Sequence, residues 1–250
     1  MRWRGRVYNY VKNEIERGAK LHFSLIDPER APSIERLQKI LEMVVDAGTD
    51  AILIGGSLQV FSDDVTSIVK LVEDFDRPSI LFPGSIAGLS PYADAVLFIS
   101  LLNSDDPYFI IGAQVYAAPL IKRFGLEVLP TGYIVVSDQP SSVSIMGRAR
   151  SIPTSKPEIG VAYALAARYM GMKFVYLEAG SGAPRPIPPL FIRSVKNFIE
   201  DTILIVGGGI RSSEAAYESI KAGADIIVTG TIIEESIDNA LNIIRAVKRF

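Results

Sequence analysis

The sequence has 250 residues, of which 48% are hydrophobic and 22% are charged, and its formal net charge is -2 at pH 7. These values are typical of a globular protein with a sizeable core and argue against disorder. The chain has no cysteine, which excludes disulfides and cysteine-ligated metals and fits a cytoplasmic location. No dense run of Lys and Arg points to nucleic acid, and no apolar run reaches the ~18 residues of a transmembrane segment. The first residues also lack the apolar stretch of a signal peptide.

Short runs rich in Ile, Val and Leu alternate along the chain with longer stretches of helical periodicity. This alternation predicts repeated βα units around a parallel sheet. The predicted strands are 21–27, 51–56, 79–84, 95–100, 132–136, 173–180, 202–209 and 225–231. The predicted helices are 3–17, which would cover the barrel floor, and 33–48, 65–75, 107–125, 157–171, 188–201, 212–223 and 236–250. Eight units in a chain of this length predict one (β/α)8 barrel domain over residues 1–250.

Two segments interrupt the regular alternation. Residues 85–94 contain glycine and proline and are too short for a covering helix, so the third outer helix is predicted to be missing or replaced by a loop. Residues 137–155 are polar and punctuated by glycine and proline. Because a long loop inside a compact domain is usually functional, we expect a lid here.

Glycine-rich loops follow the last two predicted strands. "VGGGIRSS" follows the seventh strand and "VTGT" the eighth, and each leads into a helix. Backbone N–H groups of such loops can approach an oxyanion, and the last two loops of a barrel often hold a phosphate. The predicted phosphate cradle is therefore Gly208, Gly209, Gly230 and Thr231. Tight turns without a ligand are the alternative, and Arg211 is expected to face solvent more than the phosphate.

The sixth strand ends in "YLEAGSGA", residues 176–183. Tyr176 and Glu178 have the same parity, so both point to one side of the strand. A tyrosine and a carboxylate beside a phosphate site suit a small polyol phosphate, because a carboxylate accepts hydrogen bonds from two neighbouring hydroxyls. A structural ion pair of Glu178 with Arg185 or Lys173 is the alternative.

Hard oxygen ligands follow the first two strands. Asp27 lies at the end of the first strand and Ser57 follows two glycines at the end of the second. A carboxylate, waters and substrate phosphates are the usual ligands of Mg²⁺, so these two residues are the predicted metal site. The alternative for Asp27 is a turn-stabilising role. His22 differs from Asp27 by an odd number of positions and has no partner for a zinc site, so it is interpreted as structural.

These motifs resemble one known family. "LIDPER", "GGS", "FPG", "SLLNS", "PTGYIV", "YLEAGSGA", "VGGGIRS" and "ADIIVTGT" occur in the order found in geranylgeranylglyceryl phosphate synthases of archaeal lipid biosynthesis. The resemblance spans nearly the whole chain. It implies a modified barrel that transfers a geranylgeranyl group from geranylgeranyl diphosphate to sn-glycerol 1-phosphate with Mg²⁺, releasing pyrophosphate. It also implies a homo-oligomer.

The resemblance implies the following site. The metal ligands are Asp27 and Ser57. The catalytic residues predicted from the sequence itself are Glu178, as the hypothetical base that takes the hydroxyl proton, and Tyr176. The residues that bind glycerol 1-phosphate are Tyr176, Leu177, Glu178, Ala179, Gly180, Ser181, Gly182, Gly208, Gly209, Gly230 and Thr231. From the residues themselves, we expect an apolar groove for the prenyl chain between 82–92 and 108–121, where small residues such as Ala117 leave room.

Other functions stay open at this point. A relative that uses another prenyl chain length would share every motif above. Barrel isomerases of phosphorylated sugars have the same terminal phosphate loops, but the "YLEAGSGA" segment and the missing third helix argue against them. A non-catalytic phosphate-binding module would have no use for Asp27, and a structural assembly protein would leave both glycine loops unexplained.

Overall fold

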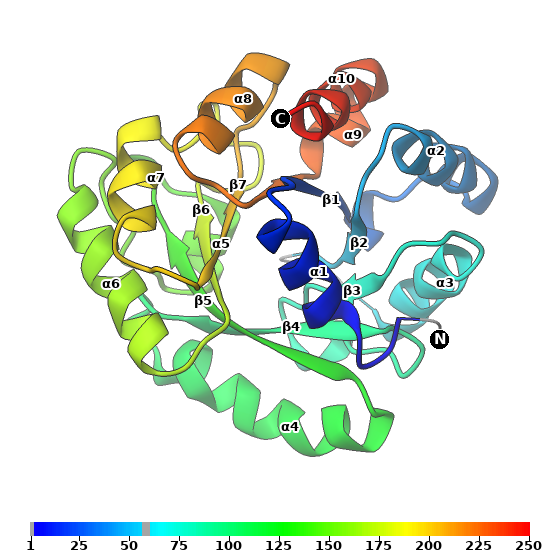
Figure 1. Cartoon of the computed structure of the whole chain (residues 1–250). Coiled ribbons are helices and arrows are strands. Elements are labelled where there is room, and N and C mark those ends of the chain that lie inside the picture. The colour runs from blue at the N-terminus through cyan, green and yellow to red at the C-terminus, as the bar shows by residue number, and fades with distance from the viewer. Residues whose placement is uncertain (1–2, 57–60) are drawn as a thin grey trace.

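The computed structural model describes residues 3–56 and 61–250, and its strands form a closed barrel in which all pairs are parallel (Figure 1). Strands that follow one another in the chain lie next to one another, and β8 closes the ring against β1. The strands are β1 Leu21–Ile26, β2 Ala51–Ile54, β3 Ser79–Leu81, β4 Ala95–Leu101, β5 Glu127–Val135, β6 Phe174–Glu178, β7 Ile203–Gly207 and β8 Ile226–Thr229. The predicted (β/α)8 barrel is confirmed.

Helices surround the barrel except at one position. They are α1 Val7–Glu16, α2 Ile34–Asp46, α3 Ser62–Val72, α4 Ala113–Phe124, α5 Ser142–Met146, α6 Pro157–Tyr169, α7 Pro189–Lys196, α8 Ser213–Lys221, α9 Thr231–Glu235 and α10 Ile237–Lys248. Between β3 and β4 the chain makes only the 3-10 turn η2, Ile86–Gly88. The predicted loss of the third covering helix is confirmed, and α3 and α4 leave a gap in the outer ring (Figure 1).

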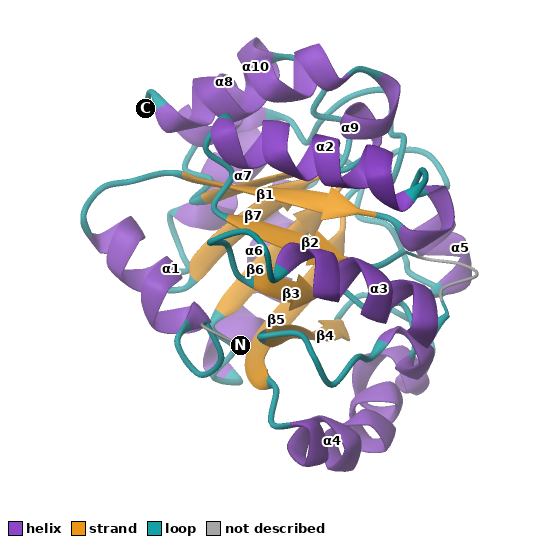
Figure 2. Cartoon of the chain, turned by 90° about the vertical axis from the view of Figure 1, so that its right-hand side faces the viewer, coloured by secondary structure: helices purple, strands orange, loops and turns teal. Residues whose placement is uncertain are grey.

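Alternation along the strands separates an inner from an outer apolar layer. Phe23 and Leu53 point into the barrel and pack in one cluster with Val7 and Val11 of α1. Ile52 and Ile54 point outward and pack against helices such as α2 and α3. Figure 2 shows α1 at one end of the barrel and α5 at the other. Because α1 fills the amino end, only the carboxyl ends of the strands are free to build a site.

The structure corrects two predicted boundaries. β5 begins at Glu127, five residues before the predicted start at 132. The Glu127 carboxylate accepts the N–H groups of Val7 and Tyr8, at 2.7 and 2.9 Å, so a contact with α1 fixes this extension. The predicted helix 107–125 divides into a π-helical turn, η3 Tyr108–Gly112, and α4. Long-range contacts of this kind leave no periodicity in the sequence.

His22 is a structural residue, as expected. Its ring is fully buried, with Nδ1 at 3.0 Å from the Thr49 hydroxyl and Nε2 at 2.9 Å from the Thr229 hydroxyl. Burial, with a smaller contribution from the charge of Lys248, lowers the pKa of His22 to about 3. The imidazole is therefore neutral at any physiological pH.

Candidate functional site

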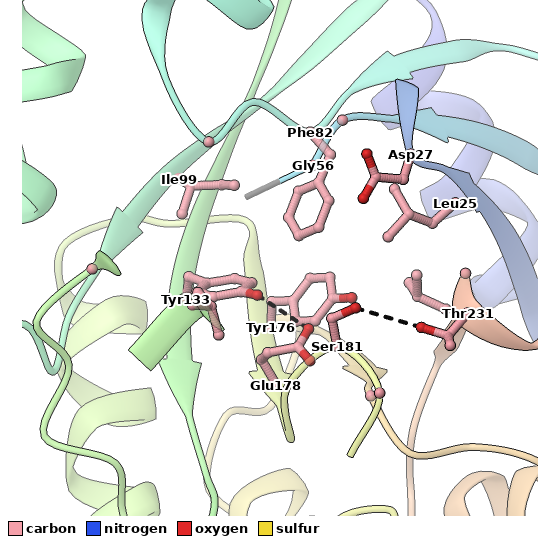
Figure 3. Close-up of a pocket in the computed structure, with 18 of the residues that line it drawn as sticks. Leu25, Asp27, Gly56, Phe82, Ile99, Tyr133, Tyr176, Glu178, Ser181 and Thr231 are labelled. Atoms are coloured by element: carbon pink, nitrogen blue, oxygen red, sulfur yellow. Dashed lines mark hydrogen bonds between the residues drawn. The ribbon is translucent and has the colours of Figure 1, made fainter. Parts of the chain in front are cut away.

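A cavity opens at the carboxyl ends of the strands, and loops from most of the barrel line it (Figure 3). Asp27 follows β1, Phe82 follows β3, and Glu178 ends β6. Gly208 and Gly209 follow β7, and the segment from Gly230 to Thr231 follows β8. Most of the residues predicted to bind the metal, the acceptor and its phosphate therefore line this one cavity.

Glu178 is a buried carboxylate that is held in place by neutral donors. Its Oε1 accepts the N–H of Gly180 at 2.6 Å, and its Oε2 accepts the hydroxyl of Tyr133 at 3.1 Å. Burial raises the pKa of Glu178 above its ordinary value, and the Gly180 N–H and the Tyr133 and Tyr176 hydroxyls oppose this rise. Neither Arg185 nor Lys173 pairs with it, and no ion pair within residues 3–56 and 61–250 includes Glu178. The carboxylate is therefore fixed in position with a raised proton affinity, as a general base requires.

The glycine loops after β7 and β8 carry backbone N–H groups that are free to bind a ligand. The N–H groups of Gly208, Gly209 and Gly230 have no hydrogen-bond partner within the part of the chain that the structure describes. Ser181, after β6, and Thr231, at the start of α9, approach with their hydroxyl oxygens 3.4 Å apart (Figure 3). Free N–H groups and hydroxyls are the groups with which proteins bind oxyanions such as phosphate, and here they line one cavity.

Some of the predicted acceptor residues do not line the cavity with their side chains. Leu177 and Ala179 point outward and pack in the apolar layer between strands and helices. The N–H of Gly180 is already taken by Glu178. Arg211 lines the cavity, but its guanidinium pairs with Glu235, with Nη1 and Oε2 2.9 Å apart. Of the predicted "YLEAGSG" segment, Tyr176, Glu178, Ser181 and Gly182 border the cavity.

Asp27 lies across the cavity from Glu178 (Figure 3). Its Oδ1 accepts the N–H of Glu29 at 3.1 Å, and burial raises the pKa of its carboxyl above the ordinary value. Ser57, the second predicted metal ligand, lies outside the described residues. The described ranges contain no group of three or more His, Asp or Glu side chains placed to hold a metal. One carboxylate together with water and substrate oxygens fits Mg²⁺, which keeps much of its hydration.

Four aromatic side chains line the cavity, and three of them, Phe82, Tyr133 and Tyr176, pack on one another between these two carboxylates. Phe82 and Tyr176 are nearly parallel, with ring centroids 5.5 Å apart, and Tyr133 lies 4.9 Å from Tyr176 and 5.9 Å from Phe82. Sequence reasoning did not find Tyr133 or Phe82 as site residues. Tyr133 has the inward parity of β5, but only the fold shows that this strand neighbours β6 in a register pairing Tyr133 with Tyr176. Phe82 follows a strand of three residues, which is too short for a parity argument.

An apolar groove adjoins the cavity on the side where η2 replaces the third covering helix. Its walls come from η2 and the preceding loop, from β4, and from α4, and they include Gly84, Ile86, Ala117 and Ile121. Gln114 borders both the cavity and the groove. This groove lies between the two segments that the sequence predicted as its walls, 82–92 and 108–121. The small side chain of Ala117 keeps it open on the α4 side.

The segment predicted as a lid, residues 137–155, covers part of the cavity. It contains the short helix α5, which begins with a capping box between Ser141 and Ser144. Val143, Met146 and Gly147 border the cavity. This segment therefore adds the apolar side chains of Val143 and Met146 to the cavity lining.

Comparison with known proteins identifies the relatives of this chain. The model of the PcrB family matches residues 13–248. The chain belongs to the PcrB family. Geranylgeranylglyceryl phosphate synthase of Saccharolobus solfataricus is 51% identical over 248 residues, covering 99% of this chain and 96% of the relative. The enzyme of the same name from Sulfolobus acidocaldarius is 49% identical over the same length and coverage. The resemblance inferred from the motifs is confirmed.

Solved structures agree with this membership of the PcrB family. The (S)-3-O-geranylgeranylglyceryl phosphate synthase of Thermoplasma acidophilum, in complex with its substrate sn-glycerol-1-phosphate, superposes with a TM-score of 0.92 at 38% identity, over 98% of this chain and 99% of that one. The tryptophan synthase α subunit of Legionella pneumophila has a TM-score of 0.62 at 11% identity over 97% of both chains, which shows a shared fold alone. No helix within residues 3–56 and 61–250 combines the length and hydrophobicity needed to cross a bilayer.

Proposed function

We propose that this chain is a prenyltransferase that moves a geranylgeranyl group from geranylgeranyl diphosphate to the 3-hydroxyl of sn-glycerol 1-phosphate. The observation that carries the proposal is a buried carboxylate, Glu178, in the same cavity as the free N–H groups of Gly208, Gly209 and Gly230. These groups would bind a phosphate at one end of a small molecule and a hydroxyl at the other. The membership of the PcrB family supports the same reaction.

The acceptor would be held from both ends. Its phosphate binds the glycine N–H groups and the hydroxyls of Ser181 and Thr231, which lie 3.4 Å apart. Its hydroxyls donate to Glu178, whose remaining lone pairs are not taken by Gly180 or Tyr133. Binding at both ends orients the reacting hydroxyl, which is a major source of rate enhancement in reactions between two molecules.

Glu178 would act as the general base. The allylic C1–O bond to diphosphate breaks with its electron pair leaving on the diphosphate, and the acceptor oxygen bonds to C1. The proton of the acceptor hydroxyl passes to Glu178. The Tyr133 hydroxyl and the Gly180 N–H hold the carboxylate for this transfer. A base with a raised pKa takes the proton more readily than an ordinary carboxylate does.

The leaving diphosphate would lie on the side of Asp27. We expect Asp27, together with Ser57, to hold Mg²⁺. When bound there, the ion would offset the negative charge that develops on the diphosphate. The prenyl chain would extend into the groove beneath η2, where Ile86, Ala117 and Ile121 provide apolar contacts. This arrangement separates the charged end of the donor from its hydrocarbon end.

A transfer assay tests the proposed function. The protein is incubated with sn-glycerol 1-phosphate, Mg²⁺ and one of a series of prenyl diphosphates with 10, 15, 20 or more carbons, and extracted lipid is identified by mass spectrometry. We expect geranylgeranylglyceryl phosphate from the intact protein and a large loss of product with Asp27→Ala. Ether product only with another donor would keep the reaction class and change the chain length. Binding of glycerol phosphate without ether product from any donor would overturn the prenyltransferase and leave a phosphosugar enzyme or a binding protein.

A further inference from the structure

Phe82 is the most accessible of the three aromatic residues that lie between Asp27 and Glu178. Tyr133 is 5% exposed and Tyr176 is 1% exposed, whereas Phe82 is half-buried. The hydroxyl of Tyr133 also donates a hydrogen bond to the carboxylate of Glu178. More of Phe82 than of either tyrosine is therefore open to a molecule in the cavity.

The position of Phe82 is fixed by its backbone. Its N–H donates to the carbonyl of Ile54 at 2.8 Å, which continues the pairing of β2 with β3. A Cβ placed on Gly55 would collide with the carbonyl oxygen of Phe82, so the two backbones pass in close contact. The ring also packs on Tyr176 with a centroid distance of 5.5 Å. Phe82 is thus held on two sides and presents the rest of its ring to the cavity.

Phe82 lies between the two carboxylates that the reaction would use. On one side, a Cβ on Gly56 would strike the carboxylate of Asp27, which places Asp27 beside the same glycine pair that supports Phe82. On the other side, the ring lies 5.9 Å from the ring of Tyr133, whose hydroxyl donates to Glu178. Figure 3 shows the Phe82 ring beside Asp27, with Tyr133 and Glu178 below it.

We propose that the Phe82 ring stabilises the positive charge that develops on the allylic carbons of the prenyl donor. This inference rests on the proposed function, because the charge exists only if the diphosphate leaves from an allylic carbon. With the diphosphate at Asp27 and the acceptor hydroxyl at Glu178, the reacting carbon lies between them, beside Phe82. The negative face of an aromatic ring attracts a nearby cation, most strongly where water is excluded. Phe82 is thereby a catalytic residue, in addition to Glu178.

The rings of Tyr133, Tyr176 and Phe109 also line the cavity, but the two tyrosines are almost fully buried and Phe109 belongs to η3. Asp27 is expected to be engaged with the metal and Glu178 with the acceptor. The side chains of Leu25 and Ile99, which also line the cavity, are apolar and uncharged. A ring that carries no net charge stabilises the cation without competing with diphosphate for Mg²⁺ or with the acceptor for the base.

The test changes the electron density of the ring without changing its size. Phe82 is replaced in the full chain by phenylalanines that carry one, two or three ring fluorines, introduced by nonsense suppression, and Phe82→Leu is made beside them. Single-turnover rates are measured with saturating prenyl diphosphate and glycerol 1-phosphate. Donor affinity is measured separately. The same fluorinated series at Phe198, an exposed residue at the end of α7, is the control.

We expect the single-turnover rate to fall stepwise with each fluorine and by roughly 3- to 30-fold for Phe82→Leu. Donor affinity should change much less than the rate, and the Phe198 series should remain flat. Equal rates across the fluorinated Phe82 series would overturn the inference, as would a loss that lies wholly in donor affinity. Absence of ether product from the unsubstituted protein would instead overturn the proposed function, so the two failures are distinguishable.

Discussion

Gly208→Ala is the substitution for which the structure gives the sharpest expectation. Gly208 has φ +82, and a Cβ added there would lie 2.5 Å from Oε1 of Glu178 and 2.8 Å from the N of Gly180. Those two atoms are bonded to each other at 2.6 Å, so neither moves away without breaking the support of the carboxylate. The added methyl group must therefore displace Glu178, the Gly180 loop or the Gly208 loop itself.

The effect on stability and the effect on activity can be estimated separately. A left-handed backbone costs a non-glycine residue about 1–2 kcal/mol, and the lower entropy of the unfolded alanine chain offsets about half of that. A net ~1 kcal/mol lowers Tm by roughly 2–4 °C in a protein of this size. Displacement of a catalytic group by ~1 Å costs about 100-fold in rate. Gly208→Ala should therefore lose a few degrees of stability and most of its activity.

Gly171→Ala is the matched control. Gly171 has φ +81, nearly the value of Gly208, but a Cβ added there has no atom within 4 Å. It lies after α6, outside the cavity. Thermal unfolding and the transfer assay are run on both variants. Gly171→Ala should lose no more stability than Gly208→Ala, because its methyl group meets no atom, and it should keep full activity. If Gly208→Ala also kept its activity, the placement of Glu178 against this loop would be refuted.

Three further predictions follow from the site and the core. Glu178→Gln should reduce turnover by 100-fold or more and remove the acid limb of the pH–rate profile, because protonation of the carboxylate below its raised pKa abolishes the base; unchanged turnover would exclude an obligatory base. Ala117→Trp should narrow the groove and reduce use of a twenty-carbon donor far more than use of a ten-carbon donor. An equal effect on both donors would show that the prenyl chain binds outside this groove. His22 has a folded pKa of about 3 against about 6.5 unfolded, so the unfolded state binds more protons between these values. The free energy of unfolding should therefore fall as the pH is lowered from 6.5 towards 3, by up to ~1.4 kcal/mol per pH unit. Denaturant titrations of His22→Gln should show a correspondingly shallower pH dependence, and an identical slope in the two proteins would contradict the neutral buried state.

The sequence predicts the barrel well because its signals are local. Each strand is a short apolar run and each covering helix has its own periodicity, so the order of elements follows without knowledge of distant contacts. The missing third helix is predicted for the same reason, from glycine and proline in 85–94. The start of β5 could not be predicted from the sequence, because it depends on hydrogen bonds from Val7 and Tyr8 to Glu127. The π-helical turn at Tyr108–Gly112 likewise has no sequence signal of its own.

The site could be predicted where glycines and carboxylates mark the ends of strands. Gly208, Gly209 and Glu178 are identified in this way, and the structure brings them together. The supporting residues could not be found, because their role arises from contacts between strands. Tyr133 becomes a partner of Glu178 only through the register of β5 with β6. Phe82 acquires its position from contacts with Ile54, Gly55 and Tyr176, which are distant in the sequence.

An isotope-labelled acceptor tests the central claim most directly. sn-Glycerol 1-phosphate with ¹⁸O in its 3-hydroxyl is incubated with geranylgeranyl diphosphate, Mg²⁺ and the intact protein, and both products are analysed by mass spectrometry. If the acceptor oxygen attacks C1 of the donor, the label appears in the ether lipid and the pyrophosphate remains unlabelled. An unlabelled lipid product, or release of pyrophosphate without any ether, would contradict the account.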